Sequence, residues 1–567
     1  MVYLLLFILF FCSCIGYAQD SAYTSPVKIP LFLSGSFAEL RSNHFHSGMD
    51  IKTGGVTGLP VYAVADGHIS RIVVSPTGFG LALYVDHPQG TTSVYGHLDN
   101  FREDIGRYIK SLQYNRKSFS LDVPIPDDLF PLKKGELIAK SGNSGSSGGP
   151  HLHFELRDTQ TEEPVNPLHY SFPVVDKTPP RLYSVMIVPL HEYAHVNYQP
   201  EKIALPVVEN NGKYVLKNDS LIPVYGMTGF AISTNDFFDG SNNRCGVYSI
   251  RMFWDGELYY SFRMDRFSFD ESRYINSHID FEEYMQSQSR FHKAWIDPGN
   301  RLGIYDYVRN NGIVRVTDGN IHHVRFVIAD LAGNTSTLDF QVVSKVSQVE
   351  RKIKPYNKLL KYNAPGSFIA ENIRIDFPEN CFYSDVPFVW RFLPSSEKFL
   401  SDVHVVHKNT VPLHHSARLS IQTANVEKRL HDKVLLVRVD TLTGKITGMG
   451  GSYANGWVTG QIRSFGNYSV AVDSIPPRIL PLSIKDKSAL TESSRIRFQI
   501  ADDLSGIKDF TGIIDGEWAL FEYDAKTGVL VHYFDSERFT FGKRHSLHVT
   551  ITDNQGNASL YEASFWK

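Results

Sequence analysis

Two histidines, His151 and His153, stand in the short segment GPHLHFEL (149–156), whose other residues favour a β-strand. Side chains two positions apart in a strand point to the same face, so both imidazoles would converge on one small region. Such a pair could present one ring to a metal ion and the other to a group that reacts beside it. An isolated His-x-His pair usually marks only a solvated strand face, so other segments must distinguish the two interpretations.

Three upstream segments carry groups of the same chemistry. HFHSGMDI separates His46 from Asp50 by three residues, and a glycine between them permits a tight backbone path. SVYGHLD places His97 at the end of an alternating run, and the glycine- and serine-rich turn GNSGSSGG leads into the strand with the two histidines. A hydrolytic zinc site takes about three N, O or S ligands and leaves one position open for water. Two imidazoles and one carboxylate meet that need, and water on such a metal ionises near neutral pH.

In order and spacing, these motifs resemble the lysostaphin-type (LytM-type) zinc endopeptidases, which cut peptidoglycan peptides. The resemblance covers roughly residues 34–167 and implies one Zn²⁺ per chain. Carried over position by position, it implies that the zinc ligands are His46, Asp50 and His153. His97 and His151 would be the non-ligand pair that orients the water and stabilises the tetrahedral oxyanion. Glu155 shares the strand face of the two histidines, and we expect it to be a surface carboxylate rather than a support for a ligand.

A stretch of about residues 101–132 is longer than we expect in compact members of this family. Its first part has helical spacing of apolar residues (Phe101, Ile105, Tyr108, Ile109, Leu112). Because it follows His97 closely in sequence, we hypothesise that it lines or covers the cleft. A packed surface insertion is the alternative.

The segment HEYAH (191–195) is a literal match to the H-E-x-x-H zinc pattern. That chemistry requires both histidines one turn apart on a helix, with a third ligand downstream. The flanking sequences SVMIVPL and VNYQPEKIALPVV favour strands around a turn. We therefore expect no zinc site at this segment.

The remaining sequence predicts several β-domains. At about 150 residues per domain, 567 residues suggest about three or four domains. The phrase VVDKTPPRLYSV returns as AVDSIPPRILPL, and each opens a segment that closes alike, in DLAGN and DNQGN. Paired prolines form stiff junctions, and the short alternating strands between Asp/Asn/Gly turns are typical of antiparallel sandwiches. The predicted fold class is mostly β: an N-terminal antiparallel peptidase domain (20–173), immunoglobulin-like β-sandwiches (174–346 and 473–567) and a separate β-domain (350–472).

The N-terminus predicts export. Residues 1–19 have the apolar run and small-residue ending of a signal peptide, although no Lys or Arg precedes the run; lipid modification at Cys14 is the alternative. We therefore expect the periplasm or cell envelope. The net charge of −3 offers no global basic field for nucleic acid. The two other cysteines, Cys245 and Cys381, do not reveal whether they pair.

Three functions follow from these patterns. The first is a secreted zinc endopeptidase that acts on the stem or bridge peptides of peptidoglycan, although the sequence does not identify the bond. The second is a non-catalytic relative that binds the wall or activates another hydrolase; such relatives usually lack ligands, and here all five positions are kept. The third is an adhesion or structural protein, in which the β-domains dock to the wall or to a protein partner.

Overall fold

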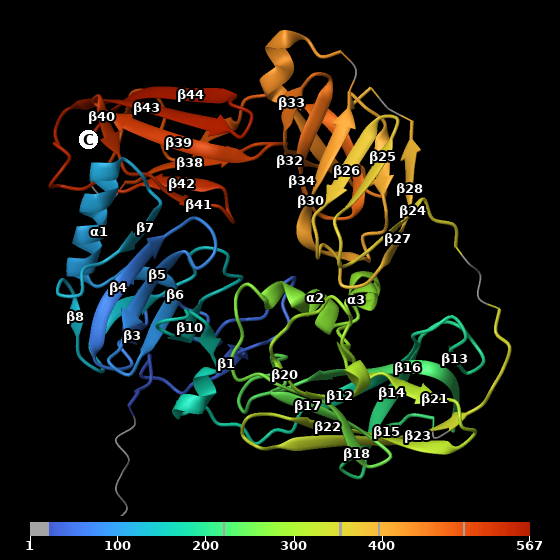
Figure 1. Cartoon of the computed structure of the whole chain (residues 1–567). Helices are drawn as coiled ribbons and strands as arrows, with labels where there is room; N and C mark the ends of the chain where they lie inside the picture. The colour runs from blue at the N-terminus through green and yellow to red at the C-terminus, as the bar shows by residue number, and fades with distance from the viewer. Residues whose placement is uncertain (1–21, 219–220, 351–353, 395–396, 424, 492–493) are drawn as a thin grey trace, which may run out of the picture.

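The computed structural model describes residues 22–218, 221–350, 354–394, 397–423, 425–491 and 494–567. The predicted signal peptide (1–19) and Cys14 lie outside these ranges. Strands predominate and the helices are few and short (Figure 1), which confirms the predicted mostly β fold class. Within the described ranges, no helix is both long and apolar enough to cross a lipid bilayer. For description we use a first domain (22–173), a second (174–346), a third (354–472) and a fourth (473–567).

Eleven strands of the first domain hydrogen-bond into one sheet, whose main path runs β1-β2-β10-β6-β5-β4-β7. In β10 the apolar Leu152, Phe154 and Leu156 pack into the core and alternate with the polar side chains of HLHFEL, as the two-residue period of a strand requires. The strands are β1 (Leu33–Gly35), β2 (Met49–Lys52), β3 (Pro60–Tyr62), β4 (Gly67–Val74), β5 (Leu81–Asp86), β6 (Thr91–Phe101), β7 (Leu121–Pro124), β8 (Pro131–Leu132), β9 (Leu137–Ser141), β10 (His151–Asp158) and β11 (Pro164–Val165), followed by the 3-10 helix η1 (Pro167–Tyr170).

The insertion after His97 contains the predicted helix, α1 (Glu103–Arg116). Ile105 and Ile109 are the buried apolar residues of this helix. The helix ends at Lys117, whose backbone adopts a left-handed conformation. Strand β7 then pairs with β4 at the end of the main path of the sheet. The apolar spacing seen in the sequence therefore packs this helix onto the first domain.

The second domain is built on one twelve-stranded sheet, in which the 14-residue strand β16 pairs with both β12 and β23. Its elements are β12 (Arg181–Pro189), β13 (His195–Val196), β14 (Ile203–Asn210), β15 (Lys213–Leu216), β16 (Ile222–Asn235), β17 (Ser249–Trp254), β18 (Glu257–Arg263), η2 (Ser272–Tyr274), α2 (Ile275–His278), α3 (Phe281–Ser287), β19 (His292–Lys293), β20 (Tyr305–Val308), η3 (Asn310–Gly312), β21 (Val314–Val316), β22 (Ile321–Ala329) and β23 (Thr335–Ser344).

The third and fourth domains each enclose their core between two main sheets. The third consists of β24 (Lys358–Leu360), β25 (Gly366–Ala370), β26 (Ile373–Phe377), β27 (Val386–Phe388), β28 (Trp390–Leu393), β29 (Val403–Val406), β30 (Pro412–Gln422), η4 (Lys428–Lys433), β31 (Val434–Val439), β32 (Ile446–Gly450), β33 (Ser452–Ala454), β34 (Trp457–Ser464) and β35 (Gly466–Val472). The fourth consists of β36 (Arg478–Pro481), β37 (Ser488–Ala489), β38 (Ile496–Ala501), β39 (Ile507–Ile514), β40 (Glu517–Ala519), β41 (Glu522–Asp524), β42 (Val529–His532), β43 (Arg544–Asp553) and β44 (Ala558–Trp566).

The fourth domain returns to the first, so that the four domains close a ring (Figure 1). Part of this contact is made by α1: Lys110 Nζ lies 2.7 Å from a carboxylate oxygen of Asp535, and Tyr114 packs edge-on against Trp518 with ring centroids 5.2 Å apart. The guanidinium of Arg538 lies over the same tyrosine ring. The insertion therefore joins the first domain to the fourth.

Candidate metal centre and active site

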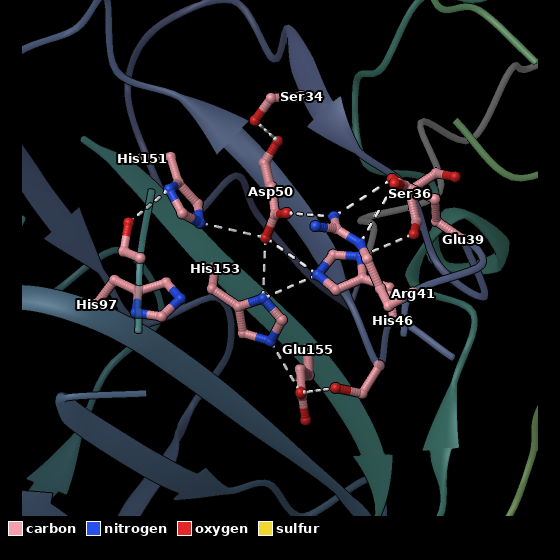
Figure 2. Close-up of polar contacts among 12 residues, drawn as sticks. Ser34, Ser36, Glu39, Arg41, His46, Asp50, His97, His151, His153 and Glu155 are labelled. Carbon is pink, nitrogen blue, oxygen red and sulfur yellow. Dashed lines mark hydrogen bonds and ion pairs between the residues drawn. The ribbon is translucent and has the colours of Figure 1, made fainter. Parts of the chain in front are cut away.

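The three predicted ligands meet because two strands pair in register. In the antiparallel pairing of β2 with β10, Asp50 lies directly opposite His153. His46 stands just before β2, and its Nε2 lies 3.1 Å from Asp50 Oδ1 and 3.1 Å from His153 Nδ1. His153 Nδ1 is also 3.0 Å from Asp50 Oδ1. Figure 2 shows the three groups converging, and they could hold a metal ion.

The tight approach of these strands depends on Gly48. A Cβ atom at this position would collide with the carbonyl oxygen of Phe154. The glycine that we expected to permit a tight backbone path therefore lets the segment with His46 lie directly against β10.

Hydrogen bonds fix which nitrogen of each ligand histidine faces the centre. His46 Nδ1 donates to the carbonyl oxygen of Ser36 (2.8 Å), which leaves the Nε2 lone pair for a metal. His153 Nε2 donates to Glu155 Oε1 (2.8 Å), which leaves its Nδ1. Ligands on a shared zinc lie about 3.3 Å apart, given zinc–nitrogen distances of about 2.0–2.1 Å in a tetrahedron. The spacing and the donor set both fit a zinc-like divalent ion.

Without a metal, a proton must supply the positive charge between these groups. Burial alone would lower the pKa of His153, but its hydrogen bonds to Asp50 and Glu155 outweigh burial and raise the pKa to about 9. Burial would likewise raise the pKa of Asp50, but the neighbouring histidines hold it well below its ordinary value. The carboxylate is therefore ionised at neutral pH, and a divalent ion would replace the proton on His153.

Glu155 is fully buried, which corrects the prediction of a surface carboxylate. It accepts hydrogen bonds from His153 and Ser47 and forms an ion pair with Arg157 at 2.6 Å. Burial would raise its pKa, but the charge of Arg157 and the bond to His153 lower it to about 2. Its position on the strand face of His153 was compatible with a supporting role. The residues that compensate its buried charge come from the tertiary structure and could not be identified from the sequence. Glu155 therefore orients a candidate metal ligand.

His97 reaches the site through a distortion of β6. Between Leu81 and Leu83 of β5 the register with β6 shifts, and His97 adopts a positive φ of 58° in the extra stretch of chain. Such a bulge redirects a side chain, and a positive φ outside glycine marks a strained position. His97 Nδ1 donates to the carbonyl oxygen of Ser144 (2.9 Å), so Nε2 remains free to act as a base. Burial and the nearby charge of His153 lower its pKa to about 3, so the ring is neutral at pH 7.

His151 stands beside His97, with ring centroids 4.8 Å apart. Its Nδ1 donates to the carbonyl oxygen of Gly149 (2.8 Å), and its Nε2 lies 3.4 Å from Asp50 Oδ1. The glycine- and serine-rich turn thus holds both imidazoles through backbone carbonyls, one at Ser144 and one at Gly149. Both rings present Nε2 to the same space beside the candidate metal.

The five predicted residues line one pocket of about 610 Å³. Arg41, which the sequence reasoning missed, also lines it and donates to Asp50 Oδ2 at 3.0 Å. Phe79, also missed, stacks on the ring of His153. No residue of 101–132 lines this pocket, so the insertion does not cover the cleft in this structure. The hypothesis that the insertion lines or covers the cleft is therefore wrong for this pocket, and the helix is instead packed on the surface of the first domain.

The second domain supports the segment that carries His46. Phe37 and Phe45 flank this part of the chain and pack on Phe267 of the second domain, with ring centroids 5.3 and 5.5 Å away. The backbone N–H of Phe45 also donates to Ser272 Oγ. The segment that carries one candidate metal ligand is therefore packed against a domain that lies outside the motifs used to predict the site.

The HEYAH segment forms no comparable site. His195 lies buried in strand β13, whereas His191 is exposed in the preceding turn, so they do not share a helix. Cys245 and Cys381 are both free and buried.

Comparison with known proteins adds to this geometry. Residues 44–114 match the model of Peptidase family M23. The first domain is an M23 peptidase domain. Residues 357–473, in the third domain, match the model of the Zu5-like domain.

The M23 domain is similar to parts of several curated proteins. An "Uncharacterized metalloprotease" of Haemophilus influenzae is 31% identical over 128 residues, 23% of this chain and 21% of that protein. The "DD-carboxypeptidase/endopeptidase Mpg" of Neisseria meningitidis is 30% identical over 139 residues, 24% of this chain and 26% of that protein. The "Murein hydrolase activator EnvC" of Escherichia coli is 28% identical over 116 residues, 20% of this chain and 21% of that protein. The similarity thus spans about a quarter or less of each relative.

Proposed function

We propose that this protein is a zinc metalloendopeptidase that hydrolyses peptide cross-links of peptidoglycan. The observation that carries the proposal is the convergence of two groups of side chains in one pocket. Three ligand atoms lie about 3 Å apart with their tautomers fixed, and two further imidazoles face the same space. Two imidazoles and a carboxylate suit zinc. The similarity to a protein named as a DD-carboxypeptidase/endopeptidase supports the substrate class.

The metal would polarise the scissile carbonyl and lower the pKa of water. The chain's own residues would then move the protons. His97 and His151 each tie Nδ1 to a backbone carbonyl and present an Nε2 lone pair, so either can accept a proton from the attacking water. The ring that accepts it becomes a cation whose Nε2–H can stabilise the oxyanion or protonate the leaving amine.

A second candidate is a non-catalytic activator of another hydrolase. The similarity to a murein hydrolase activator favours it, as does the fourth domain docked on α1 of the M23 domain. The two candidates differ in what the histidine centre must do, because an activator requires neither His97 nor His151 for its effect.

Digestion of purified peptidoglycan by the full chain separates these functions. Products would be identified by mass spectrometry for the zinc-loaded protein, the same protein with a chelator, and His153→Ala. We expect loss of cross-linked dimers only with the metal and an intact His153, and the new termini would identify the bond. A protein that folds and binds zinc, releases nothing, yet accelerates an added wall hydrolase would instead be an activator.

We also propose that the protein is exported to the periplasm or cell envelope. The apolar N-terminal run and a peptidoglycan substrate support this location. Fractionation of cells that express the tagged full chain would test it, and a tag retained in the cytoplasm would contradict it. Metabolic labelling with a fatty acid would distinguish lipid attachment at Cys14.

A further inference from the structure

A buried cluster of carboxylates lies at the junction between the M23 domain and the second domain. Asp176 precedes the paired prolines that open the second domain, Asp330 begins the DLAGN turn that closes it, and Asp236 directly follows β16. One oxygen from each lies within 4.8 Å of the others. The opening and closing phrases of the repeat, far apart in sequence, therefore meet in space around a third aspartate.

This cluster is built by hydrogen bonds and does not result from chance crowding. The carboxamide of Asn334 donates to Asp330 Oδ2 (2.7 Å) and to the backbone carbonyl of Asp176 (3.3 Å). Ser336 Oγ donates to the carbonyl of Pro180 (2.5 Å). These bonds hold the junction and the closing turn together, and Asn334 fixes the carboxylate of Asp330.

The negative charge of the cluster has no counter-charge among the described residues. Asp236 is 1% exposed and Asp330 is 3% exposed. Asp236 Oδ1 is buried without a hydrogen-bond partner, and the ion pairs of the described chain include none of the three carboxylates. Burial and mutual repulsion raise the pKa of Asp236 to about 9 and that of Asp176 to about 7. An unpaired buried polar atom carries a substantial free-energy cost, which a bound cation would remove.

We infer that Asp176, Asp236 and Asp330 bind one hard divalent cation of the calcium class. Ca²⁺ takes 6–8 oxygen ligands at about 2.3–2.6 Å, so two oxygens that share one ion lie at most about 5 Å apart, consistent with this spacing. The all-oxygen donor set disfavours zinc, which prefers nitrogen and sulfur ligands. Backbone carbonyls and water would complete the coordination.

The fourth domain contains the same arrangement with one informative difference. Asn557 donates to Asp553 and to the carbonyl of Asp473, as Asn334 does in the second domain. There, however, the third carboxylate, that of Asp502, accepts the backbone N–H groups of Leu504 and Gly506. Because that aspartate is already satisfied by the backbone, the inference concerns the second-domain cluster alone.

A series of hydrogen bonds connects the inferred site to the candidate zinc site. The backbone of Asp236 pairs with that of Cys245, and the next residue, Gly246, donates its N–H to Ser36 Oγ at 3.0 Å. The carbonyl oxygen of Ser36 in turn accepts a hydrogen bond from His46 Nδ1–H. A cation that holds the 236–246 loop would therefore stabilise the position of Ser36. Ser36 is the residue that fixes the tautomer of His46, a candidate zinc ligand.

Calorimetric titration of the full chain with Ca²⁺ tests the inference. The protein would be stripped of calcium and loaded with one equivalent of Zn²⁺, and thermal unfolding would be followed in parallel. We expect saturable binding at this site and an unfolding temperature that rises by several degrees with Ca²⁺. The same event should persist in His153→Ala, because it does not involve the histidine centre. Asp509→Asn, which removes an exposed carboxylate of the fourth domain, is the matched control and should behave like wild type.

Asp236→Asn gives opposite expectations with and without the ion. Without calcium the variant should be about as stable as wild type, because the raised pKa of Asp236 keeps that carboxyl protonated at neutral pH and the amide is likewise uncharged. With calcium it should lose one binding equivalent and show no rise from this site. If Asp236→Asn does not fold, Asp176→Asn, at a partly exposed position, provides the same comparison. Wild type that binds no Ca²⁺, or a folded variant that binds it as wild type does, would overturn the inference.

Discussion

The histidine centre of the M23 domain and the acidic cluster at its junction each gather three ligating groups, but they differ in how the charges of those groups are compensated. The ligand atoms of the first lie 3.0–3.1 Å apart, and one oxygen from each carboxylate of the second lies within 4.8 Å of the others. In the histidine centre, surrounding residues pair with each candidate ligand. Ser36 and Glu155 each accept a hydrogen bond from one ligand imidazole, and Arg41 donates to Asp50 Oδ2. In the acidic cluster, Asn334 satisfies one carboxylate while Asp236 Oδ1 has no partner in the described chain. Support from surrounding residues thus shapes the first site for a borderline metal and chemistry, whereas excess negative charge suits the second to a hard cation.

His97→Ala should have the largest effect, because it tests whether the histidine centre performs catalysis in addition to binding metal. We expect hydrolysis of peptidoglycan to fall by about 10²–10⁴-fold, the usual contribution of a general base, while bound zinc stays at one equivalent. Turnover and metal content would be measured on the same preparation. His68→Ala, on β4 outside the pocket, is the control and should keep full activity. An active His97→Ala would remove this residue from the mechanism.

Glu155→Gln tests the support behind a ligand. The amide removes the charge that orients His153 Nε2 and pairs with Arg157, so we expect zinc affinity to fall by about 10–100-fold. Competition with a chromophoric chelator would measure the affinity, with circular dichroism to confirm folding. Glu103→Gln, at the exposed start of α1, should leave affinity unchanged. Unchanged affinity in a folded Glu155→Gln would show that this carboxylate serves packing alone.

The pH dependence of zinc binding sharpens the contrast further. Because the pKa of His153 is about 9 in the metal-free protein, a proton occupies the ring at neutral pH and must leave when zinc binds. Apparent zinc affinity should therefore fall by about tenfold for each unit that pH drops below 9, and level off above it. Titration calorimetry in two buffers of different ionisation enthalpy would count the released protons. Release of no proton at pH 7 would show that His153 is already neutral.

Asp236→Asn should have the smallest effect on the histidine centre, because it acts only through the 236–246 loop and Ser36. In the presence of calcium we expect zinc to dissociate a few-fold faster from the variant than from wild type, with hydrolysis per bound zinc unchanged. Stopped-flow transfer of zinc to a chelator would give the rates, with Asp509→Asn as control. Equal rates would leave the two sites energetically independent without affecting the calcium inference, which stands on binding.

The sequence by itself determined the mostly β class and the helix inside the insertion, which follow from alternation in strands and from helical spacing. The five candidate residues of the histidine centre came from motifs that resemble those of the lysostaphin-type endopeptidases, and their roles stay predictions. It also predicted that strands, not a helix, flank the turn of the HEYAH segment, and His195 lies in β13.

The tertiary structure alone decided which groups support those residues. The sequence around Glu155 is typical of an exposed carboxylate. In the structure its buried charge is compensated by Ser47, His153 and Arg157. Nothing local indicated that α1 docks on the fourth domain away from the pocket, or that the second domain holds the segment with His46. The sequence identified the repeated opening and closing phrases, but only the fold brings Asp236 close to the aspartates of both phrases. Burial and charge balance depend on contacts between residues distant in sequence, and local residue patterns do not specify those contacts.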